Sequence, residues 1–265
     1  MPTAERRRSH LPLLERYTRD DLAIFTDEER RALGIDERSD PQREISVAWE
    51  VLYRLEPDLY DRLVRAERLH PRIADWIPAH ADRIVDVAAG SGRLTVELLD
   101  RCDELTAIEP AAPLRTILTH RLEDLVAGWT AARPPELRIL SGFFDDLPLP
   151  DGSADLVTAS SAVTPDRFHG GDRGLAEMER VCAHHGMVVI VWPNNLDWLA
   201  SHGYRYCAFA GDMAMEFASL EEAIELAQVF YPDAVGEIRR RGRALVPYEL
   251  LGVNPPRDLA YKTID

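Results

Sequence analysis

The sequence predicts an α/β fold, a doubly wound and mostly parallel sheet of seven strands that follows a helical N-terminal segment. From residue 83 on, short β-branched or apolar runs alternate with amphipathic helical patterns, which indicates βαβ units and a parallel sheet. Residues 1 to about 80 show helical patterns separated by turn signals, without a strand pattern. We therefore expect a helical cap or lid over residues 1–80 and a sheet domain over residues 81–265.

The N-terminal part is expected to hold three helices, over residues 20–33, 42–55 and 57–69. Gly34 follows the first helix, at a position where glycine commonly ends one. Pro57 suits a first helical position, and Pro71 is expected to end the helix before it. Pro78 then marks the expected boundary with the sheet domain.

The sheet domain begins with five expected parallel strands, over residues 84–87, 105–108, 137–140, 155–159 and 187–192. Helices are expected between them, over residues 94–99, 113–126 and 172–182. The fifth strand is rich in β-branched residues, so we expect it near the centre of the sheet and buried on both faces.

The C-terminal residues are expected to complete the sheet. Ser219 and Glu222 form the pattern of a capping box before a helix that runs to about residue 240. The runs 244–251 and 259–264 flank a turn segment with Gly252, a spacing that suits an antiparallel closing pair on the sheet.

Composition and charge restrict the class of protein. The 265 residues carry a formal net charge of -15, which argues against a nucleic-acid partner because such a protein needs a basic face. The three cysteines (Cys102, Cys182 and Cys207) match no metal-ligand or redox spacing, so we expect a reducing location and no metal. No apolar run is long enough to span a bilayer, and no signal-peptide pattern follows the N-terminal arginines. We expect a soluble cytoplasmic protein, a monomer or homodimer, with no membrane partner.

A candidate ligand site lies where the first strand turns into a helix, in residues 86–95, which read DVAAGSGRLT. Gly90 and Gly92 let the backbone approach a ligand closely, and the turn aims a helix N-terminus at it. Glu109 ends the second strand, 21 residues after Ala88, where an acid can accept both ribose hydroxyls of an adenosine. A dinucleotide-binding fold would place a third glycine at the position of Thr95. The bend is therefore better shaped for an amino-acid tail and a ribose than for a pyrophosphate.

These residues resemble the first motif of the class I S-adenosylmethionine-dependent methyltransferases, and Glu109 matches the acid with which that family holds the ribose. Residues 142–157, GFFDDLPLPDGSADLV, resemble the family's third-loop and fourth-strand signature, and residues 175–186 resemble the segment before its fifth strand. The resemblance covers roughly residues 83–192, in the correct order and spacing. It implies the Rossmann-like seven-stranded fold, with strands six and seven as an antiparallel edge. It also implies S-adenosyl-L-methionine as cofactor and S-adenosyl-L-homocysteine as product.

The sequence departs from the family pattern at three places. Ala88 stands where the first motif most often has glycine, and the pair His184-His185 replaces a proline and a glycine. Phe143 stands where many members have an aspartate near the adenine. Either Asp145 takes over that role or Phe143 and Phe144 form an apolar wall. Because adjacent residues leaving a strand point in opposite directions, we expect one of the two phenylalanines in the core.

Carried over to this sequence, the resemblance implies cofactor contacts at the carboxyl ends of four strands, by Asp86, Ala88, Gly90, Gly92, Glu109, Pro110, Phe143, Phe144, Asp145 and Ser160. Asp86 has two interpretations, since it either contacts the cofactor or orients the glycine bend. Glu109 has the alternative of a plain surface acid.

Two residues are candidate general bases. His169 follows the fourth strand on the side where acceptors bind in this fold, with a loop histidine without a role as the alternative. Tyr204 follows the fifth strand. Other amide and aromatic residues after that strand either wall an acceptor pocket or pack the last helices on the sheet: Asn194, Asn195, Trp198, His202 and Tyr206.

The sequence thus predicts transfer of the sulfonium methyl group of S-adenosylmethionine to an O, N or C nucleophile of a small-molecule acceptor. Because the positive sulfur already activates this methyl group, the protein mainly has to align the reactants and exclude water. Three alternatives remain open. They are another reaction of the same cofactor, such as cyclisation or aminocarboxypropyl transfer; an idle cofactor-binding module; and a nicotinamide dehydrogenase, which Thr95 disfavours.

Overall fold

The computed structural model describes residues 11–36, 41–130 and 133–265, and the chain divides into two compact units. The sheet unit comprises Leu69–Gly211 and Pro256–Asp265. The helical unit comprises the chain up to Arg68 together with Asp212–Pro255. This division differs from the expected boundary at residue 80, because residues 212–255 join the N-terminal helices instead of completing the sheet domain. The position of the helices as a lid over a cofactor stays a prediction.

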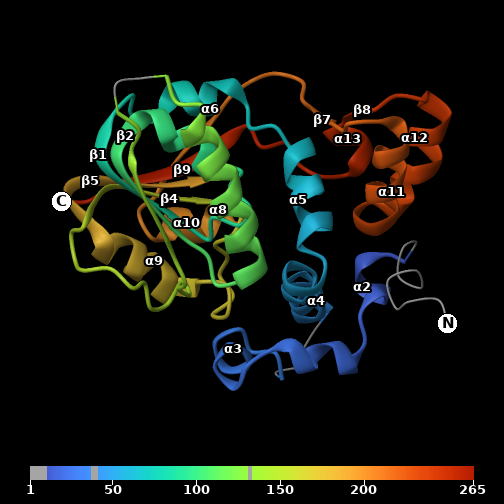
Figure 1. Cartoon of the computed structure of the whole chain (residues 1–265), viewed down its shortest axis with the longest axis horizontal. Helices are drawn as coiled ribbons and strands as arrows, with labels where there is room; N and C mark the ends of the chain where they lie inside the picture. The colour runs from blue at the N-terminus through green and yellow to red at the C-terminus, as the bar shows by residue number, and fades with distance from the viewer. Residues whose placement is uncertain (1–10, 37–40, 131–132) are drawn as a thin grey trace. The chain divides into compact units, whose positions relative to one another are not determined.

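The sheet unit contains a seven-stranded sheet in the order β3-β2-β1-β4-β5-β9-β6 (Figure 1). The strands are β1 (Ala81–Val87), β2 (Cys102–Ile108), β3 (Glu136–Leu140), β4 (Ala154–Ser160), β5 (Cys182–Val191), β6 (Arg205–Ala208) and β9 (Asp258–Thr263). The first five pair in parallel, whereas β9 pairs antiparallel with both β5 and β6. The doubly wound, mostly parallel sheet and its five predicted parallel strands are confirmed. β5 lies between β4 and β9 with its carboxyl half buried, as predicted.

The predicted closing pair is wrong in one of its two strands. The run 259–264 is β9, but its antiparallel neighbour at the sheet edge is β6, from the segment after β5. The run 244–251 instead holds β8 (Leu245–Pro247) and α13 (Tyr248–Leu251) in the helical unit, where β8 pairs with β7 (Ala214–Glu216). A hairpin-like spacing predicts pairing only when no further element intervenes, and here the partners are chosen by interactions between distant segments.

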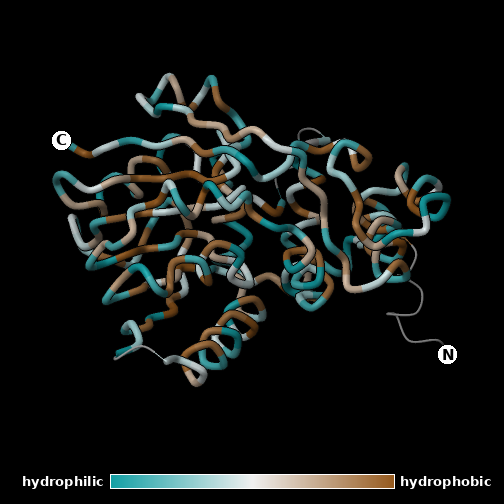
Figure 2. Tube along the Cα trace, turned by 90° about the horizontal axis from the view of Figure 1, so that it is seen from above, coloured by the Kyte–Doolittle hydropathy of each residue, from teal (hydrophilic) through white to brown (hydrophobic). Residues whose placement is uncertain are grey.

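Two apolar clusters, one on each face of the sheet, form the core of the sheet unit. On one face pack α6 (Pro71–Trp76), α7 (Thr95–Leu98), η2 (Leu99–Arg101) and α8 (Ala112–Ala127). On the other face pack α9 (Gly171–Val181) and α10 (Leu196–Ser201). Hydrophobic and hydrophilic stretches alternate along the chain trace in Figure 2. The helices predicted over residues 94–99, 113–126 and 172–182 are confirmed as α7 with η2, α8 and α9.

Helix α6 was not predicted, because Pro71 begins this helix instead of ending the one before it. Proline suits the first helical position, since the N–H that it lacks would have no partner within the helix. His70 caps the helix, its Nδ1 accepting the N–H of Arg72 at 3.2 Å.

The helical unit combines N-terminal and C-terminal helices. It holds α2 (Leu13–Arg16), η1 (Arg19–Ile24), α3 (Asp27–Ala32), α4 (Pro41–Leu55), α5 (Pro57–Ala66), α11 (Leu220–Phe230), η3 (Pro232–Ala234) and α12 (Val235–Arg241). The helices predicted over residues 42–55 and 57–69 are confirmed as α4 and α5. None of the described helices is long and apolar enough to cross a membrane.

Two predicted helices of this unit are interrupted. The helix expected over residues 20–33 is divided because Thr26 forms a capping box with Glu29 and so begins α3. The helix expected from Ser219 to about residue 240 begins as predicted, with Ser219 Oγ accepting the N–H of Glu222 at 3.0 Å. It ends at Phe230, because Pro232 begins a separate 3-10 turn.

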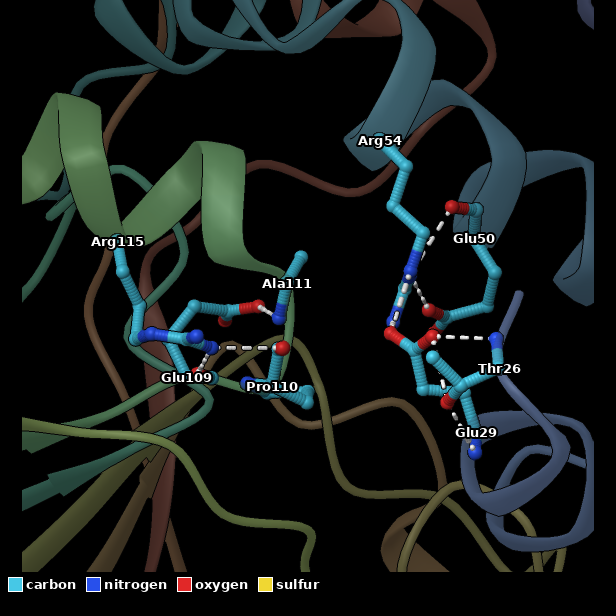
Figure 3. Close-up of polar contacts among 8 residues, drawn as sticks. All are labelled: Thr26, Glu29, Glu50, Arg54, Glu109, Pro110, Ala111 and Arg115. Carbon is cyan, nitrogen blue, oxygen red and sulfur yellow. Dashed lines mark hydrogen bonds and ion pairs between the residues drawn. The ribbon is translucent and has the colours of Figure 1, made fainter. Parts of the chain in front are cut away.

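Ion pairs and stacked rings connect the elements of the helical unit. Arg16 and Glu56 form two parallel hydrogen bonds of 2.7 Å each. Arg54 binds Glu29 at 2.9 Å and Glu50 at 2.7 Å (Figure 3). Trp49 of α4 stacks on Phe230 of α11, with ring centroids 5.3 Å apart. Apart from the Arg54–Glu50 pair, which lies within α4, these contacts join segments that are far apart in the sequence.

Candidate functional site

The chain leaves three neighbouring strands of the sheet through strained bends at their carboxyl ends. The residues that follow β1, β4 and β5 are Ala88, Ser161 and Trp192, with φ of 54°, 52° and 53°. Non-glycine residues rarely adopt this left-handed conformation, and such strain gathers at functional sites. The carboxyl edge of β1, β4 and β5 is therefore the candidate site, which is also where ligands bind in open α/β sheets.

The bend after β1 brings its backbone close to helix α8. Gly90 and Gly92 have φ of 58° and 102°. A Cβ atom at Gly92 would lie 2.8 Å from Leu118 Cδ1, so a side chain at this position would collide with α8. Ala88 stands where the first motif most often has glycine. It has a positive φ, a backbone conformation that is strained for a residue with a side chain.

Glu109 joins the end of β2 to this bend. It is 5% exposed, and its carboxylate accepts the N–H of Gly90 at 2.9 Å. It also accepts the N–H of Ala111 at 2.8 Å (Figure 3). Arg115 of α8 donates to the carbonyl oxygens of Glu109 and Pro110, both at 2.7 Å. The alternative of Glu109 as a surface acid is thus excluded, because the side chain is buried and faces the glycine bend.

Asp86 is buried beside the same bend. Its carboxylate accepts a hydrogen bond from the Thr95 hydroxyl at 2.6 Å and another from the Thr158 hydroxyl at 2.8 Å. Burial raises the pKa of this carboxyl to about 6. Both oxygens are therefore bound to side chains of the protein itself.

Two buried hydroxyl groups at the carboxyl edge have no hydrogen-bond partner among the described residues. They are Ser91 Oγ, in the glycine bend, and Ser160 Oγ, at the end of β4. A buried polar group without a partner is costly, so such groups in a native protein point to a ligand or a bound water. Both hydroxyls lie at the carboxyl ends of β1 and β4, the edge of the sheet where ligands bind in open α/β folds.

The loop after β3 divides its two phenylalanines as expected. Phe144 packs against the core and against α9, since a Cβ atom at Gly174 would lie 3.2 Å from Phe144 Cβ. Phe143 forms a backbone bridge with Asp146. Asp145 lies 3.9 Å from Arg173 in an ion pair. Contact of Phe143 or Asp145 with an adenine stays a prediction.

The two candidate bases lie in different places. His169 lies in the loop between β4 and α9, on the carboxyl side, with its Nδ1 3.6 Å from Asp166 Oδ2. Tyr204 is a core residue, 5% exposed, and Glu179 and Cys182 are among its electrostatic neighbours. Because Glu179 lies near the end of α9 and Cys182 begins β5, Tyr204 lies toward the amino end of that strand. The prediction of Tyr204 as a base is therefore wrong.

The residues after β5 connect α10 to α9. Asn195 caps α10 by accepting the N–H of Trp198 at 3.0 Å. Trp198 Nε1 donates to Asp172 Oδ1 at 3.0 Å, and His202 Nε2 lies 3.2 Å from the same oxygen. These contacts favour the packing interpretation for Trp198 and His202 over the pocket interpretation.

The sequence reasoning missed the roles of Thr158, Thr95 and Ser91. Thr158 carried a signal, since it is a polar residue between the apolar Val157 and Ala159 and lies directly opposite Asp86 in the β1–β4 register. At residue 95 the sequence indicated only that the third glycine of a dinucleotide-binding fold is missing, and gave no sign that the Thr95 hydroxyl binds Asp86. Ser91 carried no signal beyond its place between two glycines.

Comparison with known proteins finds methyltransferases. The methyltransferase domain family matches residues 85–190. Uncharacterized methyltransferases of Mycobacterium bovis and Mycobacterium tuberculosis are 30% identical over 164 residues, and the match covers 60% of this chain and 60% of each relative. A probable ribosomal RNA small subunit methyltransferase A of Natronomonas pharaonis is 29% identical over 115 residues, which are 43% of this chain and 40% of that protein. Among solved structures, the YcgJ protein of Bacillus subtilis aligns with a TM-score of 0.47 at 12% identity, over 72% of this chain and 94% of that one. The chain thus matches the curated relatives over about three fifths of their length or less.

Proposed function

We propose that the protein transfers a methyl group from S-adenosylmethionine to an O, N or C nucleophile of a small molecule, and the proposal starts from the match of residues 85–190 to the methyltransferase domain family. The observation that carries the proposal is the bond between Glu109 and Gly90, which brings a buried carboxylate against a glycine bend at the carboxyl edge. The Glu109 carboxylate can accept hydrogen bonds from ribose hydroxyls. The glycine bend beside it exposes backbone that a ligand can approach closely.

The proposed cofactor site draws on four loops. Glu109 would accept hydrogen bonds from the ribose hydroxyls. The hydroxyl groups of Ser91 and Ser160, which have no partner among the described residues, would form hydrogen bonds with polar groups of the cofactor. The cofactor supplies a methyl group activated by a sulfonium centre. The protein then has to fix the acceptor in line with that group and keep water away from it.

Thr95 favours this cofactor over a nicotinamide dinucleotide. Its side chain is 0% exposed and donates its hydroxyl to Asp86, at the position where a dinucleotide-binding fold has its third glycine. The tight approach of the helix that a pyrophosphate site requires is therefore replaced by a side-chain contact.

The proposed acceptor is a small molecule. The net charge of -15 disfavours long phosphate chains, including the RNA named for the relative from Natronomonas pharaonis. If the acceptor arrives protonated, His169 is the proposed base, and Asp166 beside Nδ1 would leave Nε2 to take the proton. Replacing His169 with Ala and measuring turnover from pH 6 to pH 9 tests this role, since an unchanged profile would dismiss it.

Calorimetry tests the cofactor directly. We expect S-adenosylhomocysteine to bind the whole protein and NAD not to bind. The variant Glu109→Gln should bind the product at least 30-fold more weakly, because its amide cannot accept both backbone N–H groups. Glu104→Gln, an exposed residue on the same strand β2, is the matched control and should bind normally.

Two outcomes would contradict the proposal. Tight binding of NAD in place of S-adenosylhomocysteine would indicate a dehydrogenase. Products other than S-adenosylhomocysteine, seen by mass spectrometry of turnover mixtures, would indicate another reaction of the same cofactor.

A further inference from the structure

One carboxylate links three elements of the sheet unit beside the proposed cofactor site. Asp86 on β1 and Thr158 on β4 are direct register partners, and Thr95 begins α7. The two threonine hydroxyls bind different oxygens of the carboxylate, at 2.6 Å and 2.8 Å. We call these three residues the Asp86 clasp.

The clasp closes the glycine bend at its base. Asp86 and Thr95 are nine residues apart, and the bend from Ala88 to Gly92 lies between them. Within the bend, backbone bonds run from Gly92 N–H to the Ala89 carbonyl at 2.9 Å and from Val96 N–H to the Gly92 carbonyl at 3.2 Å. The side-chain link therefore fixes where the strand ends and the helix begins, which sets the path of the loop between them.

The clasp places an ionisable carboxyl group at a buried position of the sheet, where neighbouring positions on the same face hold apolar side chains. Two residues earlier on the same face, the register partners are Ile84 and Leu156, each 1% exposed. Asp86 is also 1% exposed, and burial raises its pKa to about 6. In the part of the chain that the structure describes, no basic side chain pairs with it. A buried charge held by neutral donors destabilises a fold relative to a neutral residue of the same shape, so stability does not explain it.

We propose that Asp86 is a positioning residue, which holds the glycine bend in its cofactor-binding path through Thr95 and Thr158 and does not itself contact the cofactor. This inference rests on the proposed function of the site. It replaces the expectation that Asp86 is a direct contact, because Asp86 lies within β1, is 1% exposed and is bound by two side-chain hydroxyl groups, whereas Glu109 lies beyond the last residue of β2.

Binding of S-adenosylhomocysteine to threonine variants tests the clasp. Thr95→Val and Thr158→Val keep the shape of the side chain and remove the hydroxyl group. We expect each to weaken binding at least tenfold, the effect of losing one hydrogen bond to a charged group. Thr95→Ser and Thr158→Ser keep the hydroxyl and should bind within threefold of the wild type. Thr106→Val, a buried threonine of β2 outside the clasp, is the matched control and should bind normally.

Once an acceptor is known, the same valine variants should raise the KM for the cofactor and leave kcat at saturating cofactor within threefold. A direct contact to the reacting group would lower kcat instead.

The variant Asp86→Asn separates a positioning role from a purely structural one. It removes the charge and keeps the shape, so we expect a higher Tm at pH 7.5 together with weaker cofactor binding. A parallel loss of Tm and affinity would indicate a purely structural residue and overturn the proposal.

The remaining outcomes are distinguishable from a failure of the proposed function. If the wild type does not bind S-adenosylhomocysteine, both proposals fall. If the wild type binds and the valine variants bind equally well, only the clasp is overturned. A crystal structure with S-adenosylhomocysteine in which Asp86 bonds the ligand directly would likewise overturn it.

Discussion

The two units bury charge in different ways. In the helical unit, three of the buried charged residues, Arg16, Glu50 and Asp61, each pair with an opposite charge. In the sheet unit, Asp86 and Glu109 are buried against neutral hydroxyl and amide donors. Both of these acids lie at the carboxyl edge, at or near the ends of β1 and β2.

The contrast separates structural charge from functional charge. An ion pair with good geometry compensates for part of the desolvation of its members, and removing one member leaves the other unpaired. The Asp86 carboxylate, which accepts bonds from two neutral hydroxyl groups, has less compensation of this kind, and its place at the candidate site agrees with the positioning role proposed for it. The three pairs of the helical unit are thus interpreted as structural, and Asp86 as part of the candidate site.

The largest expected effect is in the helical unit, for the variant Arg16→Met. Glu56 would lose its two 2.7 Å bonds and stay 17% exposed. We expect the free energy of unfolding of the protein to fall by about 3 kcal/mol, the lower range for breaking a buried pair. Urea unfolding at pH 7.5 measures it.

The control for this variant is Arg68→Met, in an exposed pair with Glu216. Such pairs contribute little, so no change beyond experimental error is expected. Equal losses for both variants would remove the distinction between buried and exposed pairs in this unit.

The second effect concerns the glycine bend of the sheet unit. Gly92→Ala places a Cβ atom 2.8 Å from Leu118 Cδ1 at a φ of 102°, so we expect a loss of about 2 kcal/mol in unfolding free energy. Gly128→Ala is the control, because Gly128 caps α8 with a φ of -88° and its nearest neighbour would be 3.7 Å away. It should stay within about 0.5 kcal/mol of the wild type. A tolerated alanine at residue 92 would show that the close approach to α8 is not required.

The third effect is a pH dependence of the free energy of unfolding that is caused by Asp86 in the sheet unit. The folded pKa of Asp86 is about 6, against an ordinary value of 3.8, so the folded state binds this proton more tightly than the unfolded chain does. Protonation thus stabilises the fold, and this stabilisation is lost as the pH rises through about 6. Relative to Asp86→Asn, the wild type should lose about 1.4 kcal/mol between pH 5 and pH 7.5.

Urea unfolding of both proteins at the two pH values measures this difference, since the other titrating groups are shared. A difference between the two proteins that does not change with pH would mean that the pKa of Asp86 is not raised in the folded protein. The contrast between the buried charges of the two units would then be smaller than their burial indicates.

The smallest effect concerns the alanine in the first motif. Because Ala88 has a φ of 54°, Ala88→Gly relieves strain and should raise the unfolding free energy by about 0.5 kcal/mol after the entropy of glycine is included. Ala89 is buried and outside the left-handed region, so Ala89→Gly should lower it by about 1 kcal/mol. Thermal unfolding of the two variants should therefore shift in opposite directions, and a shift in the same direction would contradict the assigned backbone strain.

The sheet unit was the more predictable of the two, for a local reason. Four of the strands from β1 to β5 are short apolar runs followed by a helix, and only β3 is followed by a loop, so the pattern within a few dozen residues identifies most of these elements. The first motif and Glu109 could be placed at one edge because the carboxyl ends of parallel strands meet there. The error at residues 244–251 came from a segment that lies in the helical unit, where its partner β7 is about thirty residues earlier in the chain.

The sequence by itself determined the parallel sheet, its cofactor-type bend and the acid that ends the second strand, because periodicity and turn residues act over short distances. The tertiary structure alone decided that residues 212–255 join the N-terminal helices, that Tyr204 lies in the core, and that Asp86 is bound by Thr95 and Thr158. Those outcomes depend on which side chains meet after the chain has folded. Hydrogen bonds and ion pairs between distant residues leave no repeating pattern in the sequence from which they could be predicted.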